Sequence, residues 1–102
     1  MTIDNLIFVG FNKYVIALDR DSGEIVWQQQ LSHTGYVSLM LDGDRLIAST
    51  NGYMDCLNPL NGKILWKNSL KGFGIGVASI ASVRGQTMHQ LAAQAKSDRE
   101  SQ

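Results

Sequence analysis

Short apolar runs alternate with polar turns along most of this chain. The runs are rich in β-branched and aromatic residues and are bounded by clusters of Gly, Asn, Asp and Ser, a pattern that predicts β-strands joined by tight turns. The Asn51-Gly52 pair is the strongest hairpin signal among these turns. The predicted strands cover residues 6–9, 14–18, 24–30, 36–41, 45–50, 53–57 and 63–68.

The stretch 17–27, Ala-Leu-Asp-Arg-Asp-Ser-Gly-Glu-Ile-Val-Trp, is predicted to form one complete hairpin. An apolar run ends at Leu18, and the polar residues that follow have short side chains that can bond to nearby backbone. Gly23 can adopt the positive φ that closes such a turn. The apolar run then resumes and ends at Trp27.

The same unit returns without a gap as residues 56–66, which lie 39 residues further along the chain. Gly23 aligns with Gly62 and Trp27 aligns with Trp66. A fixed period of this length indicates a repeat architecture, and the short strands within each period favour propeller blades over a helical solenoid.

The phase of the repeat predicts how the blades are divided. Residues 6–9 align with 45–48, which belong to the second strand of a blade, and residues 73–83 align with the strand at 36–41. The chain is therefore expected to hold strands two to four of one blade, all of a second, and the first strand of a third. We predict an all-β fold with about two blades of four antiparallel strands in residues 1–84.

The periodicity changes after this region. From Thr87, apolar residues fall on one helical face, and Gln90 completes a capping box with Thr87. Residues 85–102 are therefore predicted to form a short C-terminal α-helix followed by a polar tail.

The repeated hairpin resembles the tryptophan-docking motif of quinoprotein-type (PQQ-like) β-propeller repeats, over about residues 4–84. The second copy departs from the motif at Cys56, Asn58 and Asn61. The resemblance implies that the tryptophans pack between neighbouring blades, and that the chain, like many members of that family, is a protein-binding scaffold without a quinone. The residues expected to dock the blades are Ala17, Asp19, Ser22, Gly23, Trp27, Gly62 and Trp66.

Composition narrows the function further. The chain has 102 residues and a formal net charge of zero. It therefore lacks the excess of positive charge that is typical of proteins binding nucleic acid or an anionic membrane. The first residues carry no secretory leader pattern and no apolar run is long enough to span a bilayer, so a cytoplasmic location is expected. Cys56 is the single cysteine and is expected to be a small core residue.

A quinone-dependent dehydrogenase fragment or cofactor-binding domain is the alternative function. The resemblance implies that such enzymes need an acidic base and calcium ligands, and often carry a cysteine pair. The Asp42-Gly43-Asp44 turn lacks the other oxygen ligands of a calcium loop, and His33 and His89 are too isolated to form a metal site. We therefore expect no cofactor, no metal and no enzymatic activity.

Two blades cannot close a propeller, which needs about four to eight. Bare sheet edges are usually protected in natural proteins. We therefore expect a homotrimer or homotetramer that closes a ring, or a protein partner such as a toxin or an enzyme. The function predicted is that of a non-catalytic scaffold or an inhibitor of the immunity-protein type. The expected interface residues are Leu6, Phe8, Phe73, Ile75, Val77, Ser79, Met88 and Leu91.

Overall fold

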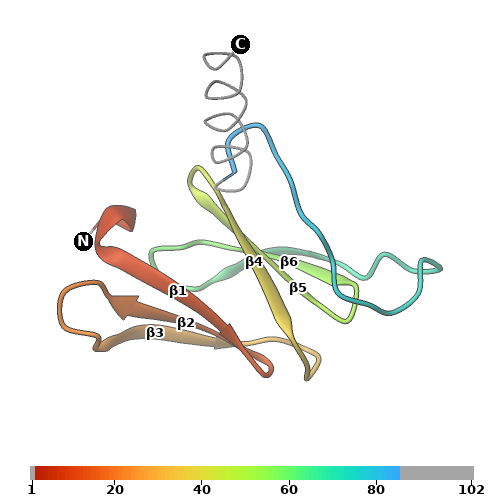
Figure 1. Cartoon of the computed structure of the whole chain (residues 1–102), viewed down its shortest axis with the longest axis horizontal. Helices are drawn as coiled ribbons and strands as arrows, with labels where there is room; N and C mark the ends of the chain where they lie inside the picture. The colour runs from red at the N-terminus through yellow and green to blue at the C-terminus, as the bar shows by residue number, and fades with distance from the viewer. Residues whose placement is uncertain (1, 86–102) are drawn as a thin grey trace, which may run out of the picture.

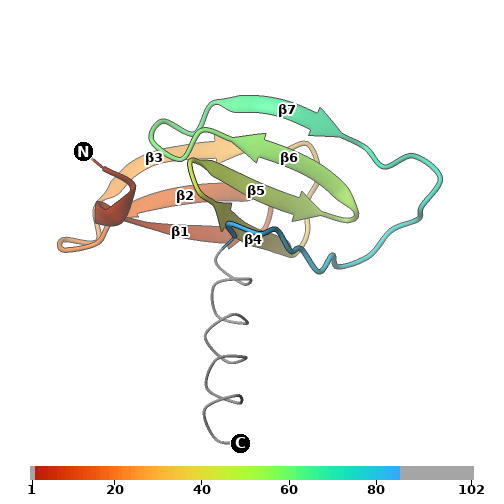
Figure 2. The same cartoon turned by 90° about the horizontal axis from the view of Figure 1, so that it is seen from above.

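Seven strands form two antiparallel sheets in the computed structural model, which describes residues 2–85 (Figure 1). A 3-10 turn, η1 (Ile3–Asn5), precedes the first strand. Both sheets keep their strands in sequence order, as Figure 2 shows. The all-β prediction is confirmed, whereas the helix predicted from Thr87 lies outside the described residues. The first sheet contains β1 (Leu6–Phe11), β2 (Tyr14–Asp19) and β3 (Ile25–Gln30), and the second contains β4 (Val37–Asp42), β5 (Arg45–Thr50), β6 (Tyr53–Leu57) and β7 (Ile64–Asn68).

The sequence repeat is reproduced in the strand register. Ala17 of β2 faces Trp27 of β3, and in the second sheet Cys56 of β6 faces Trp66 of β7. Each pair of strands has a register shift directly after its small residue, at Ala17/Leu18 and at Cys56/Leu57. Such a bulge bends its strand and increases the local twist, so the two hairpins have matching shapes.

The main core lies between the two sheets. Alternate residues of each strand point into it, because side chains of a strand alternate between the two faces. Close approach of the sheets depends on Gly10 of β1, where an added Cβ would lie 2.8 Å from the Cβ of Val37 on β4. The buried residues of this core are Leu6, Val15, Ala17, Trp27, Leu31, Val37, Leu46, Ala48 and Leu57.

The eighth strand, predicted over residues 73–83, is not formed. The first strand of a blade pairs with the second, and residues 2–85 contain no second strand for a third blade. The chain also departs from the repeat at Leu70, which adopts a φ of 47° and is 37% exposed, whereas the equivalent Leu31 is 2% exposed. The prediction of a strand at 73–83 was therefore wrong for the described chain.

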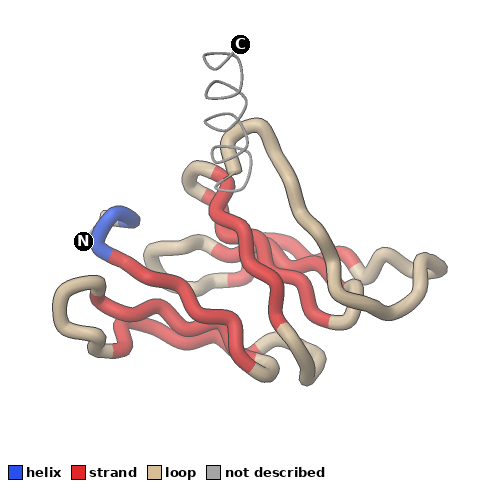
Figure 3. Tube along the Cα trace, in the orientation of Figure 1, coloured by secondary structure: helices blue, strands red, loops and turns tan. Residues whose placement is uncertain are grey.

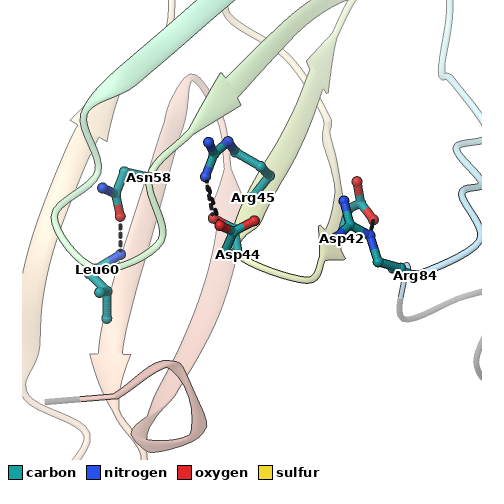
Figure 4. A network of polar contacts seen from close by, with 6 residues as sticks. All are labelled: Asp42, Asp44, Arg45, Asn58, Leu60 and Arg84. Carbon is teal, nitrogen blue, oxygen red and sulfur yellow. Dashed lines mark hydrogen bonds and ion pairs between the residues drawn. The ribbon is translucent and has the colours of Figure 1, made fainter.

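The segment after β7 instead returns along the second sheet as an extended loop (Figure 3). Its end is attached to Asp42, the last residue of β4, by a backbone bridge from Gly85. The Ser82 hydroxyl donates a hydrogen bond to Asp42 Oδ1 over 3.0 Å, and the Arg84 guanidinium lies 3.8 Å from the same oxygen (Figure 4). Ile80 packs against the apolar cluster on the second sheet's outer face.

Candidate protein-interaction surfaces

The first blade-docking turn joins β2 to β3 and is held by Asp19. The backbone N–H groups of Asp21 and Ser22 donate to Asp19 Oδ1 over 2.8 and 3.0 Å. These two hydrogen bonds stabilise the charged carboxylate and lower the pKa of Asp19. The turn closes at Gly23, whose φ of 76° suits glycine, and whose N–H donates to the Asp19 carbonyl over 2.8 Å.

The second turn, between β6 and β7, has the same structure although its sequence departs from the motif. Asn58 Oδ1 accepts a hydrogen bond from Leu60 N–H over 2.9 Å (Figure 4), and Asn61 Oδ1 accepts one from Lys63 N–H over 2.9 Å. The N–H of Gly62 donates to the Asn58 carbonyl over 2.7 Å, and Gly62 has a φ of 78°. An amide oxygen accepts these hydrogen bonds as a carboxylate or hydroxyl does, so the turn is preserved.

Trp27 joins the two blades by packing on this second turn. Its side chain is 9% exposed, and its indole Nε1–H donates to the carbonyl of Pro59 over 2.8 Å. A Cβ added to Gly62 would lie 2.8 Å from Cδ2 of the Trp27 ring. The indole therefore occupies the space that the side chain of any larger residue at position 62 would need. The Phe8 ring centroid lies 6.1 Å from that of Trp27.

The chain also carries the two halves of this contact separately. Trp66 is equivalent to Trp27, yet 48% of it is exposed. Gly23 is equivalent to Gly62 and has nearly the same φ, yet within residues 2–85 no atom beyond its chain neighbours lies within 4 Å of an added Cβ. The structure therefore shows one docked tryptophan, one undocked tryptophan and one open docking turn.

The outward face of the first sheet is apolar and exposed. Ile7 is 48% exposed, whereas the equivalent Leu46 of the second sheet is buried at 1%. Ile25 is 60% exposed, whereas the equivalent Ile64 is half-buried against the core. Phe11, at the end of β1, is 68% exposed. This open face corresponds to the face of the second sheet that packs against the first.

The outward face of the second sheet forms a smaller apolar cluster around Met40, Ile47 and Cys56, against which Met54 and Ile80 pack. The Cys56 side chain is fully buried, and this burial raises the pKa of its thiol. A buried thiol with a raised pKa is a poor nucleophile, in keeping with the core role expected for this residue.

The predicted interface residues fall into three groups. Leu6 and Phe8 face the second sheet of the same chain. Because side chains alternate along a strand, the exposed apolar surface of β1 is formed by Ile7 and Phe11 on the opposite face. Met88 and Leu91 lie outside the described residues. The remaining predicted residues are exposed on the loop after β7: Phe73, Ile75, Val77 and Ser79.

An open pocket of about 230 Å³ beside Asp55 was not predicted from the sequence. Asp55 of β6 is among its lining residues and is only 4% exposed, and this burial raises the pKa of its carboxyl group. The rings of His33 and Tyr53, also in the lining, stack with centroids 3.7 Å apart. The signal in the sequence was a break in the repeat, because Asp55 stands where the first blade has Ile16.

The acidic turn at Asp42 and Asp44 has ordinary ion-pair partners. Arg45 lies 3.1 Å from Asp44, and Arg84 is close to Asp42, as described above (Figure 4). Within residues 2–85, no group of three or more His, Cys, Asp or Glu side chains is placed to hold a metal ion. The same part of the chain contains no helix with the length and apolar character needed to cross a bilayer.

The comparisons with known proteins agree with this architecture. No curated protein sequence matches the chain. A family model described as outer membrane protein assembly factor BamB, built on PQQ-like repeats, matches residues 11–97, which include both docking turns and both tryptophans. The chain therefore belongs to this family of PQQ-like β-propeller repeats.

Proposed function

We propose that this chain is a non-catalytic protein-binding module, acting as a scaffold or as an inhibitor of the immunity-protein type. The observation that supports the proposal is the exposed apolar face of the first sheet, with Ile7 at 48%, Ile25 at 60% and Phe11 at 68% exposure. An apolar sheet face of this kind marks a site for association with another protein. Within residues 2–85 no strand pairs with the outer edge of β1, so this edge adds backbone groups to that surface.

Association between copies is one way to cover these surfaces. A head-to-tail contact closes into a ring when its rotation allows it. With about two blades per chain, three copies would supply six blades and four copies would supply eight, and both numbers occur in propellers. A toxin or an enzyme that covers the same faces would serve as the alternative partner.

The absence of catalysis is part of the proposal. The thiol of Cys56 is buried, the Asp19 carboxylate accepts hydrogen bonds within its own turn, and the Trp27 indole donates a hydrogen bond in the contact between the blades. The alternative of a quinone-dependent enzyme makes a different prediction. Quinone binding would raise the melting temperature of the protein and add an absorbance band, and either result at one quinone per chain would contradict our proposal. The cytoplasmic location stays a prediction.

Light scattering on the purified chain tests the proposal directly. The chain has a mass of 11.2 kDa, and we expect the measured mass to rise with concentration toward three or four times that value. A mass that stays at that of one chain throughout the micromolar range would contradict association between copies. The same instrument, with a candidate toxin or enzyme added, then measures binding of a different protein.

A further inference from the structure

We propose that two copies dock head-to-tail, with Trp66 of one copy resting on Gly23 of the next and donating its indole N–H to the carbonyl of Arg20. This inference rests on the proposed function, for which it names the partner and the contact. It assigns the exposed tryptophan and the open turn to one interface between identical chains.

The contact inside the chain supplies the template. Trp27 packs on Gly62 and donates to the Pro59 carbonyl over 2.8 Å. Along the repeat, Trp66 replaces Trp27, Gly23 replaces Gly62, and Arg20 replaces Pro59. The acceptor is a backbone carbonyl, so the change from Pro59 to Arg20 leaves it in place.

The receiving turn already has the shape that docking requires. The first turn matches the second in its hydrogen bonds, from Gly23 N–H to Asp19 O and from Gly62 N–H to Asn58 O, and in φ values of 76° and 78°. A site that is organised before binding saves the cost of ordering it. The exposed Ile25 lies on the adjoining strand, where its counterpart Ile64 packs on the core of the first contact.

The loop after β7 supports a second copy as the occupant. By the repeat, residues 75–80 correspond to 36–41, which cover most of β4, and β4 pairs with β5 in the register Leu41↔Leu46. Transferred by one period, this register places Ile80 of one copy opposite Ile7 of the next. One chain therefore offers a tryptophan and an edge segment, while the other offers a docking turn and the edge of β1, which no strand within residues 2–85 covers.

Charge does not oppose the contact. The chain has nine basic and nine acidic residues, so two copies meet without net repulsion. A few residues near the centre of an interface, tryptophans prominent among them, typically supply most of the binding energy. Trp66 is such a residue, since about half of its surface is available for burial.

The test compares association constants of variants by analytical ultracentrifugation. Trp66→Ala and Gly23→Ala are each expected to weaken self-association at least tenfold, because each removes one half of the contact. Leu65→Ala is the matched control. Its position corresponds to Val26, which remains 37% exposed beside the docked Trp27, so this variant should associate like the wild type. Ile25→Asp provides a second variant of the receiving face if Gly23→Ala proves unstable.

A mixture of the two defective variants gives the sharpest result. Trp66→Ala keeps an intact turn and Gly23→Ala keeps an intact tryptophan, so an equimolar mixture can form one complete contact per pair. We expect heterodimers in the mixture, with the larger assemblies of the wild type abolished. Continued full association of Trp66→Ala would overturn this inference but leave the binding module in place, because another surface would then be responsible. A wild type that never associates would overturn this inference together with association between copies, whereas the binding-module proposal would then depend on the measurement with an added toxin or enzyme.

Discussion

Alanine substitutions at the two docking glycines separate two losses of stability, one from displacing the tryptophan ring and one from straining the backbone of the turn. Gly62 and Gly23 occupy equivalent turns with φ values of 78° and 76°. Placing a Cβ on a residue in this left-handed region costs roughly 1–2 kcal/mol. Both variants carry this cost, so their difference isolates what happens to the indole ring above Gly62.

The difference can be worked out from the structure. An added Cβ at Gly62 would lie 2.8 Å from Trp27 Cδ2, whereas nothing beyond the chain neighbours of Gly23 in residues 2–85 lies within 4 Å of one there. Overpacking of a filled site costs typically about 1–3 kcal/mol. Displacement of the ring would also break the hydrogen bond from Trp27 to Pro59, worth roughly 1 kcal/mol. Gly62→Ala should therefore lower the free energy of unfolding by about 2–4 kcal/mol more than Gly23→Ala does.

Urea unfolding followed by circular dichroism measures this difference. The protein must be diluted below its association range, so that Gly23→Ala reports only on the single chain. In Gly62→Ala the emission of Trp27 should also shift to longer wavelength, since the indole moves toward water. Equal losses of stability in the two variants would refute the docking geometry, because they would show that the ring does not rest on Gly62.

Two further predictions concern single side chains. Trp27→Ala should lower the free energy of unfolding by about 3–5 kcal/mol as a core truncation. Trp66→Ala in the dissociated chain should lower it by about half as much, since Trp66 is already 48% exposed. Thermal melts of both variants check this, and an unchanged melting temperature for Trp27→Ala would show that the residue is not structural. Because the pKa of Asp55 is raised, the folded state binds the carboxyl proton more tightly than the unfolded state does. The stability that this proton binding contributes is present below the ordinary pKa and is lost as the pH rises through the raised pKa. The stability of Asp55→Asn relative to wild type should therefore increase from pH 3 to pH 7. Asp19→Asn replaces a carboxyl group with a lowered pKa, so its stability relative to wild type should decrease over the same range. If the stabilities of the two variants changed in parallel with pH, both pKa directions would be contradicted.

Much of the fold could be predicted because the same physical constraints act twice in the sequence. The 39-residue period places Gly23 and Gly62 in equivalent turns and the two tryptophans on equivalent strands, as the structure shows. The substitution at Asn58 looked like a departure from the motif. It leaves the turn intact, because the amide oxygen accepts the hydrogen bond that the Asp19 carboxylate accepts in the first copy.

Features that depend on neighbours outside the repeat could not be predicted in the same way. Residues 73–83 have the pattern of a first strand, but a strand needs a partner, and residues 2–85 leave this one unpaired. The exposure of Trp66 has the same origin, because the sequence marks a docking residue without showing whether a turn is available to receive it. The open pocket at Asp55 arises where one residue breaks the repeat, and its shape depends on the loop that carries His33.

Hydrogen exchange of the two indole N–H groups tests the central claim most directly. The chain has two tryptophans, so an NMR spectrum of the ¹⁵N-labelled protein shows one indole signal for each. In dilute protein we expect the Trp27 signal to be protected by its hydrogen bond to Pro59 and the Trp66 signal to exchange rapidly. At concentrations where copies associate, the Trp66 signal should become protected as well. Rapid exchange of Trp66 in the associated protein, or of Trp27 at any concentration, would contradict the account.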